Sequence, residues 1–356
     1  MLAYVIATLL SVGLAIMAQP TTTFKGKYFS KGLRTLFEAL SIVPLTYLAA
    51  YRVNVGTDYY AYVEFFYHPK WFQMHFSPLF YGLGSMLAKI SNNSQVFFIV
   101  TSIIIYTITF IVIYYESDSF GLSILFFVIS EDYFVSLNIV SQFIAIAIVC
   151  VSILFFRAKK YIASIILLIV ALFFHQAAFC IIALYLSYWI FKDFKKMIAF
   201  TGLITVGALI GIPILIKLIS HYTSYGRYFN SNYANTQYSV AIPMLIIFLG
   251  LCLITIVMCG NKINNNSKIK LFLYSSIIAI ETLLLSFKLT GNTYRLTYYF
   301  SCALYMYFPS VIKAIPVKKS KYIITVIVIV LLSIWTILLI THNNQNVLPY
   351  QSIFSR

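Results

Sequence analysis

The densest group of polar residues in the chain directly follows an apolar stretch. It reads Arg52-Val53-Asn54-Val55-Gly56-Thr57-Asp58-Tyr59-Tyr60-Ala61-Tyr62. An arginine offers a planar fork of donors that can bind a phosphate through two hydrogen bonds, and a glycine lets the backbone come close to a ligand. The carboxylate of Asp58 can accept a proton from an attacking hydroxyl group. The segment therefore predicts a phosphate-binding site with a general base. The alternative is that Arg52 pairs with Asp58 and anchors a helix end.

Acidic residues elsewhere in the chain are few, and three of them need an explanation. Glu131 and Asp132 are adjacent, which is typical of a solvated turn at a helix end. The functional alternative is a general base or a partner for Arg295. Glu281 lies within an apolar stretch, where an ionised carboxylate costs about 2.5–3.5 kcal/mol. It must therefore be protonated or paired, and Lys288 is a candidate partner.

The composition excludes a water-soluble fold. Of the 356 residues 61% are hydrophobic and 10% are charged, whereas about 25% are charged in a typical soluble domain. Uncharged stretches near the roughly 20 residues of a membrane-crossing helix recur along the chain, for example 96–115 and 322–341. They are continuous and not alternating, which favours helices over strands. We therefore predict an all-α, polytopic integral membrane protein folded as a helical bundle.

The net charge of +16 comes largely from short basic loops. Such loops are typical of the cytoplasmic side of a membrane protein. The charge therefore reflects membrane topology, and we expect no nucleic-acid partner. The loops contain Lys25, Lys27, Lys31 and Arg34; Arg157, Lys159 and Lys160; Lys192, Lys195 and Lys196; Lys262, Lys268 and Lys270; and Lys313, Lys318, Lys319 and Lys321.

These loops also predict the topology. With them in the cytoplasm, the tail after Thr341, the loop 220–238 and His175, which lies in a turn between two apolar helices, are extracytoplasmic. A retained first helix places the N-terminus outside as well, and residues 52–95 form a second extracytoplasmic excursion. The membrane crossings counted from the N-terminus and those counted from the C-terminus are consistent if a segment near 77–90 is re-entrant or interfacial. The total is then about 12 crossings. We expect one transmembrane bundle domain, 1–356.

The motif R-x-x-x-G-T-D-x-x-x-Y in residues 52–62 resembles the signature of the EpsG-type family of Wzy-like bacterial polymerases, which make exopolysaccharide, capsule and O-antigen. Three further pieces resemble the family in the same chain order, and together they cover nearly the whole chain. These are Phe173-Phe174-His175-Gln176-Ala177-Ala178, the segment from Asn292 to Phe300 with Arg295 and Tyr299, and Val347-Leu348-Pro349-Tyr350.

The resemblance implies a glycosyltransferase-type polymerase of the cytoplasmic (inner) membrane with both termini outside. Its donor and acceptor would be undecaprenyl-pyrophosphate-linked glycans at the outer face, and it would need neither a metal nor another cofactor. Membrane lipid, chain-length regulator and flippase proteins are its expected partners. The expected catalytic residues are Asp58 and His175. The expected substrate-binding residues are Arg52, Gly56, Thr57, Tyr62, Asn138, Gln142, Arg227, Arg295 and Tyr299.

A lone histidine at a helix turn is more often an interfacial residue than a catalytic one. His175 is favoured for catalysis because the basic loops place it on the same side as Arg52 and Arg295.

The sequence departs from the family pattern at two positions. Where the family shows Asn-x-x-Arg-Gln-x-x-Ala, the stretch 138–145 has Ser141 in place of the arginine. Ser77 also precedes Pro78 where the family often has an acidic residue. Activity then depends on Arg52, Arg227 and Arg295, or this chain works differently.

Two other classes of protein fit a bundle of this size. A flippase or transporter also suits 12 crossings, but it should show repeated halves and mid-membrane ionisable residues, of which only Glu281 is present. An O-antigen ligase or acyltransferase is the second alternative, and the R-x-x-x-G-T-D motif argues against it.

Overall fold

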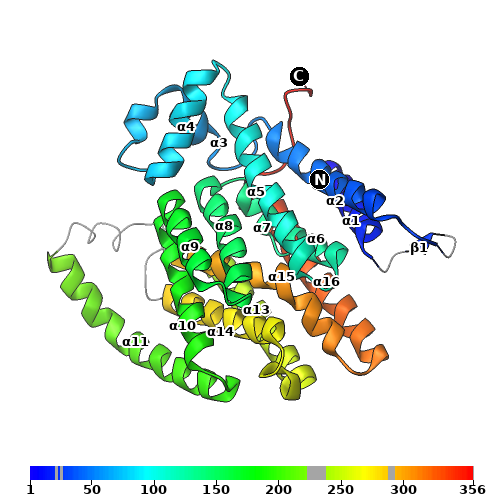
Figure 1. Ribbon diagram of the computed structural model, residues 1–356. Helices are drawn as coiled ribbons and strands as arrows, with labels where there is room; N and C mark the ends of the chain where they lie inside the picture. The colour runs from blue at the N-terminus through cyan, green and yellow to red at the C-terminus, as the bar shows by residue number, and fades with distance from the viewer. Residues whose placement is uncertain (21–22, 25–26, 223–237, 288–292, 356) are drawn as a thin grey trace. The chain divides into compact units, whose positions relative to one another are not determined.

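The computed structural model describes residues 1–20, 23–24, 27–222, 238–287 and 293–355 (Figure 1). Helices dominate, as predicted, and a short antiparallel hairpin lies in the basic segment after the first helix. The elements in chain order are α1 (Leu2–Ala18), β1 (Thr23–Phe24), β2 (Lys27–Tyr28), α2 (Lys31–Ala50), α3 (Tyr59–Tyr67), η1 (Pro69–Phe72), α4 (Pro78–Ile90), α5 (Gln95–Glu116), α6 (Phe120–Ile129), α7 (Asp132–Ser136), α8 (Val140–Arg157), α9 (Tyr161–Phe174), η2 (Gln176–Ile181), α10 (Ile182–Ile190), α11 (Phe194–Tyr222), α13 (Tyr238–Ile263), α14 (Ser267–Ser286), η4 (Thr293–Thr297), α15 (Tyr298–Ala314) and α16 (Lys318–Thr341).

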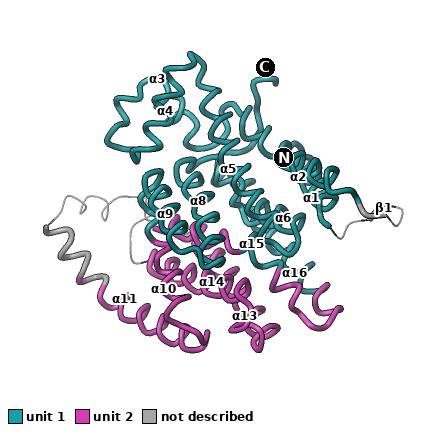
Figure 2. The backbone as a smooth tube through the Cα atoms, in the orientation of Figure 1, with its two compact units in different colours: residues 1–179, 304–309, 323–356 teal, residues 180–303, 310–322 magenta. Residues whose placement is uncertain are grey.

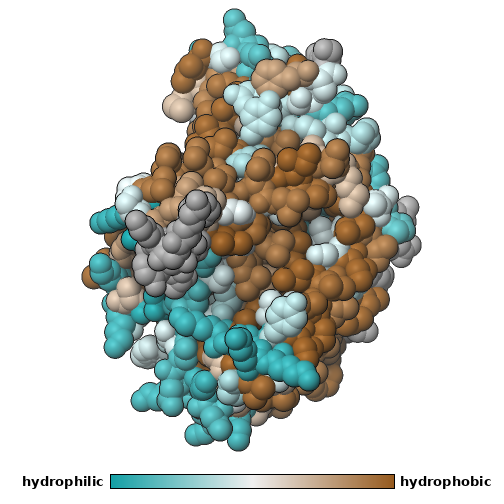
Figure 3. Space-filling model, turned by 90° about the vertical axis from the view of Figure 1, so that its right-hand side faces the viewer, coloured by the Kyte–Doolittle hydropathy of each residue, from teal (hydrophilic) through white to brown (hydrophobic). Residues whose placement is uncertain are grey.

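Seven helices within the described residues are long and apolar enough to cross a membrane, namely α2, α5, α8, α14, α16 and most of α11 and α13. Shorter apolar helices include α1, α6 and α9. Hydrophobic side chains form a broad surface in the space-filling view (Figure 3). Exposed leucines and isoleucines such as Leu9 and Ile162 contribute to the apolar surface. The prediction of a helical membrane protein is confirmed, whereas the count of about 12 crossings stays a prediction.

Contacts within the chain define two compact units (Figure 2). Unit 1 contains Met1–Phe179, Leu304–Pro309 and Ile323–Arg356, and unit 2 contains Cys180–Ala303 and Ser310–Tyr322. The expectation of one domain over the whole chain stays a prediction.

Helices of unit 1 run back and forth between the same two ends of the unit. α1 starts where the hydroxyl of Tyr4 donates to the carbonyl of Val347 in the C-terminal tail (3.1 Å). α2 packs against α1 and ends at Ala50, whose carbonyl accepts a hydrogen bond from the side chain of Gln95 at the start of α5. We call the end that holds these residues the junction end. Both chain termini lie there (Figure 1).

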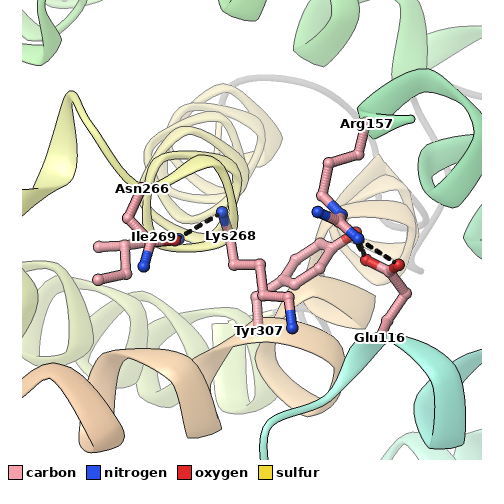
Figure 4. Close-up of polar contacts among 6 residues, drawn as sticks. All are labelled: Glu116, Arg157, Asn266, Lys268, Ile269 and Tyr307. Carbon is pink, nitrogen blue, oxygen red and sulfur yellow. Dashed lines mark hydrogen bonds and ion pairs between the residues drawn. The ribbon is translucent and has the colours of Figure 1, made fainter. Parts of the chain in front are cut away.

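The opposite end of unit 1, which we call the basic end, holds the far ends of α5 and α8 (Figure 4). The guanidinium group of Arg157 donates to both carboxylate oxygens of Glu116, each at 2.7 Å, and the hydroxyl of Tyr307 donates to the same carboxylate at 3.1 Å. α8 starts at the junction end, and its 18 residues extend about 27 Å to Arg157. Lysines 159–160 follow directly, so this end carries one of the predicted cytoplasmic basic loops.

The segment 52–95 leaves the junction end and returns to it. It contains α3, η1 and α4, and it closes where Gln95 bonds to the carbonyl of Ala50. α4 has 13 residues, about 20 Å in length, whereas a crossing helix needs roughly 20 residues. The segment therefore starts and finishes at the same end of unit 1. The re-entrant or interfacial segment near 77–90 stays a prediction.

The polar break at Ser130 separates α6 from α7, and it is not a solvated turn. Glu131 adopts a left-handed backbone conformation (φ 70°), and both Glu131 and Asp132 are fully buried. The hydroxyl of Ser130 donates to the Asp132 carboxylate at 2.6 Å. The expectation of a solvated turn is wrong because α6 has only 10 residues, about 15 Å, so the break falls within the packed helices and not at the surface.

Unit 2 is organised around α14, which packs against α10, α11, α13 and η4. The side chain of Asn266 caps α14 by accepting from the backbone N–H groups of Lys268 and Ile269 (3.0 and 3.3 Å; Figure 4). Glu281, in the middle of α14, forms side-chain hydrogen bonds with Thr201 and Thr205 of α11. Glu281 is therefore paired with hydroxyl groups. Lys288, its partner candidate from the sequence, lies outside the described residues.

Candidate functional site

Three segments that are far apart in the sequence meet at the junction end. They are residues 52–58 after α2, residues 137–140 at the start of α8, and residues 345–353 of the tail, and we call this assembly the junction. The tail pairs with the first segment in an antiparallel bridge, in which the N–H of Val53 donates to Gln351 (3.0 Å) and that of Ile353 donates to Tyr51 (3.1 Å). The tail is therefore paired with the segment that carries the R-x-x-x-G-T-D motif.

Asn138 links all three segments through its side chain and backbone. Its Nδ2 donates to the side-chain oxygen of Gln345 at 2.7 Å and to the carbonyl of the same residue at 3.1 Å. Its Oδ1 accepts from the N–H of Asp58 at 3.5 Å, and its carbonyl accepts from the hydroxyl of Tyr62 at 2.7 Å. An amide suits this position because it donates and accepts at once. The buried side chain of Asn138 thus holds the backbone N–H of Asp58.

Gly56 lets the motif approach Asn138 closely. Its φ is +107°, a conformation that side chains disfavour, and its N–H donates to the carbonyl of Asn346 in the tail at 2.8 Å. A Cβ atom at this position would lie 2.7 Å from Oδ1 of Asn138. The sequence predicted that Gly56 lets the backbone come close to a ligand, whereas in the structure the glycine leaves room for the side-chain amide of Asn138.

Arg52 is 1% exposed and is held entirely by the protein. Its Nη1 donates to the carbonyl of Ala49 at 2.6 Å, its Nη2 donates to that of Leu137 at 2.9 Å, and its guanidinium carbon lies 4.7 Å from the centre of the Phe98 ring. Burial lowers the pKa of Arg52, although an arginine keeps its charge in proteins. The alternative of an ion pair with Asp58 does not form, and the guanidinium group instead ties α2 to the segment before α8.

Asp58 and Thr57 are the accessible members of the motif. Thr57 is exposed and Asp58 is partly exposed. The hydroxyl of Thr57 donates to the carboxylate of Asp58 at 3.1 Å. The structure thus presents an accessible carboxylate next to a backbone N–H that is hydrogen-bonded to the buried Asn138.

His175 lies at the junction end by the course of the chain. α8 leads from the junction end to the basic end, and α9 returns antiparallel to it. Reciprocal hydrogen bonds between Ser152 and Ser164 join the two helices (2.7 and 2.9 Å). The partly exposed His175 caps the returning helix, which also packs against α4.

The other predicted site residues belong to both units. Tyr62 and Gln142 are buried in unit 1, and the hydroxyl of Tyr62 also accepts from the N–H of Val140 at 3.0 Å. Arg295 and Tyr299 belong to unit 2, where Arg295 is partly exposed in η4 and Tyr299 is buried in α15. Arg227 lies outside the described residues.

Sequence reasoning missed three contributors to the junction. Gln345 and Asn346 bind Asn138 and Gly56, and Phe98 lies against Arg52. The Val-Leu-Pro-Tyr tail was the one signal that could have pointed to the first two. The hydroxyl of Tyr350 from that tail donates to the carbonyl of Leu48 at 3.2 Å, and burial raises its pKa to about 12.

These features define a class of protein: a multi-helix membrane protein with an accessible carboxylate mounted on a buried polar junction at one end of its helices. The profile of the EpsG family matches residues 35–352, nearly the whole chain. The chain therefore belongs to the EpsG family, a family of Wzy-like polysaccharide polymerases. The match ends at Ser352, the tail residue that bridges to Arg52. Neither a curated protein nor a solved structure matches the chain.

Proposed function

We propose that this protein joins undecaprenyl-pyrophosphate-linked glycan repeat units at the outer face of the cytoplasmic membrane. Membership in the EpsG family supports a polymerase role in polysaccharide biosynthesis. The observation that carries the proposal is the partly exposed carboxylate of Asp58 at the junction end of unit 1, on a residue whose backbone N–H donates to the buried Asn138.

The distribution of charge supports the outer face. Arg157 and lysines 159–160 lie at the basic end of unit 1, and Asp58 lies at the other end. Basic loops favour the cytoplasmic side, which assigns the junction end to the outside. The N-terminus and the C-terminal tail are at the junction end too, so both termini are extracytoplasmic in this proposal.

The reaction is a substitution at the anomeric carbon of the donor sugar. A hydroxyl oxygen of the acceptor glycan forms the new bond to that carbon, and the bond from the carbon to the pyrophosphate oxygen breaks with its electron pair leaving on the pyrophosphate. The hydroxyl proton passes to the carboxylate of Asp58, or alternatively to His175. A base held on a fixed backbone favours this transfer because the reacting groups need less reorganisation.

Arg52 acts in this proposal as a positioning residue. Both of its terminal nitrogens donate to backbone carbonyls, and its side chain is buried. Gly56, Tyr62, Asn138 and Gln142 likewise shape the junction, whereas Thr57 shares the accessible surface with Asp58. Arg227 and Arg295 stay predictions for binding the pyrophosphate, whose developing charge a guanidinium group stabilises.

Replacing one carboxylate tests the proposal. Cells that carry Asp58→Asn should accumulate single lipid-linked repeat units on the outer leaflet and lose long polymer, with unchanged amounts of the protein in the membrane. Glu64→Gln is the matched control, because Glu64 is an exposed carboxylate on α3, less than two turns beyond Asp58. Full-length polymer in the Asp58→Asn cells would exclude this residue as the base. Accumulation on the inner leaflet would indicate a flippase instead.

A further inference from the structure

The excursion 52–95 contains a cavity of about 590 Å³ that lies between α3, η1 and α4 in unit 1. Small-molecule sites in proteins usually measure roughly 300–1,000 Å³. The cavity is separate from the junction, since none of the junction residues lines it. Its lining includes Tyr67, Lys70, Tyr81, Ser85, Lys89 and Asn92.

The lining has the chemistry of a site for an anionic sugar. Lys70 and Lys89 are both exposed, and none of the residues that line the cavity is acidic. Tyr67 is 52% exposed, and its hydroxyl donates to the carbonyl of Asn92 at 3.4 Å, so the ring is held at the rim. The hydroxyl oxygen of Ser85 is buried and has no hydrogen-bond partner. Aromatic faces, hydroxyl and amide groups and two cations therefore surround one space.

The cavity is connected to Asp58 by a single rigid element. Asp58 is the N-cap of α3, and Tyr67 is the last residue of the same helix. Nine helical residues extend about 13 Å, a length that a short oligosaccharide can bridge. The same helix is anchored at its start by the bond from Tyr62 to Asn138.

We propose that this cavity binds an acidic stretch of the glycan, with the sugar's carboxylate or phosphate group between Lys70 and Lys89. This inference rests on the proposed function and adds a substrate class to it, namely a repeat unit that carries a negatively charged sugar. Ammonium groups bind such anions through charge-assisted hydrogen bonds, and tyrosine rings pack against apolar sugar faces. The volume and the aromatic rim favour a sugar over a lipid phosphate.

Binding of defined probes to the purified full-length protein in nanodiscs of zwitterionic lipid tests the proposal. Tetragalacturonate should bind at least about tenfold more tightly than neutral maltotetraose, since a factor of ten corresponds to about 1.4 kcal/mol and a charge-assisted hydrogen bond contributes that much. The double variant K70Q/K89Q should lose this preference and keep its unfolding temperature, because both side chains are exposed. K318Q/K319Q, which removes two exposed lysines at the start of α16, is the control for net charge.

Two results would overturn the proposal. They are equal binding of both tetrasaccharides, and tetragalacturonate binding that survives in K70Q/K89Q. If surviving binding is accompanied by loss of co-purifying phosphatidylglycerol, the lysines are assigned to lipid headgroups. The variant D58N separates this inference from the proposed function. It should bind tetragalacturonate like the wild type while it fails to polymerise, and polymerisation by D58N with intact binding would refute only the proposed function.

Discussion

The side-chain oxygen of Asn138 lies against Gly56, only 2.7 Å from the position that a Cβ atom would take there. The same oxygen accepts the hydrogen bond from the N–H of Asp58. Packing at Gly56 and the orientation of Asp58 therefore depend on one amide group, which couples the backbone of the motif to its accessible carboxylate.

Gly56→Ala should consequently damage both stability and activity. The new methyl group must displace the Asn138 amide, and φ of +107° is unfavourable for alanine, so we expect a loss of about 1–3 kcal/mol in the free energy of unfolding. Polymer length in cells should fall because Asp58 loses its fixed position. Thermal unfolding of the purified protein and gel analysis of the surface polymer measure the two effects.

Gly82→Ala is the control for this substitution. Nothing lies within 4 Å of a Cβ atom at Gly82, which is in the helix α4, and alanine is favoured over glycine in a helix by about 1 kcal/mol. We expect equal or higher stability and normal polymer. Wild-type behaviour of Gly56→Ala would show that the contact with Asn138 is unimportant.

Arg52→Lys should behave like a loss of structure, even though it keeps the positive charge. One ammonium group cannot reach the two carbonyls of Ala49 and Leu137 with the planar fork that Arg52 uses. Loss of one hydrogen bond from a charged group costs about 1.5–3 kcal/mol, so the unfolding temperature should fall together with activity. An Arg52→Lys protein of normal stability that has lost activity would instead indicate that Arg52 contacts the substrate.

The sequence predicted the helices well because uncharged runs of spanning length must be helical in a membrane. The stretches expected at 96–115 and 322–341 correspond to α5 and α16 within a few residues. The basic loops predicted that Arg157 and Arg52 lie on opposite sides of the membrane, and the structure places the two residues at opposite ends of unit 1, whereas the sidedness stays a prediction. The sequence could not show that Arg52 would be buried, because its partners are backbone carbonyls of Ala49 and Leu137, which any residue type supplies. The burial of Glu131 depends likewise on where α6 ends in three dimensions.

Ser141→Arg should be tolerated and should increase activity. Ser141 is partly exposed, whereas its neighbours Val140 and Gln142 are buried, so a longer side chain can extend outward without displacing the core. An exposed substitution changes stability by less than about 0.5 kcal/mol. An arginine is the residue expected here from the family pattern, and one charge-assisted contact to the pyrophosphate would raise kcat/KM by about tenfold.

The matched variant is Ser141→Gln, which adds length without charge. Polymerisation rates with purified lipid-linked repeat units compare the two. An increase with glutamine as large as that with arginine, or a decrease in both, would contradict a role for the positive charge.

The ion pair between Glu116 and Arg157 at the basic end predicts a variant that affects stability alone. In Arg157→Ala the carboxylate of Glu116, whose side chain is 4% exposed, keeps only the hydroxyl of Tyr307. Removing one partner of a fully buried pair costs about 3–5 kcal/mol. Because the Arg157 side chain is 28% exposed, we expect about 2 kcal/mol after discounting for solvent screening.

Adding Glu116→Gln to Arg157→Ala should recover part of this loss, since the neutral amide leaves no unpaired charge in the protein. Tyr307→Phe alone should lower the free energy of unfolding by about 1 kcal/mol, the contribution of one hydrogen bond. Lys196→Ala, which removes an exposed lysine, is the control and should leave the free energy of unfolding almost unchanged. Thermal unfolding gives these values, and polymer length at a permissive temperature should stay normal in all four variants because the pair lies at the end of unit 1 opposite Asp58. A fully stable Arg157→Ala protein that makes no polymer would place part of the chemistry at the basic end and would require a different site.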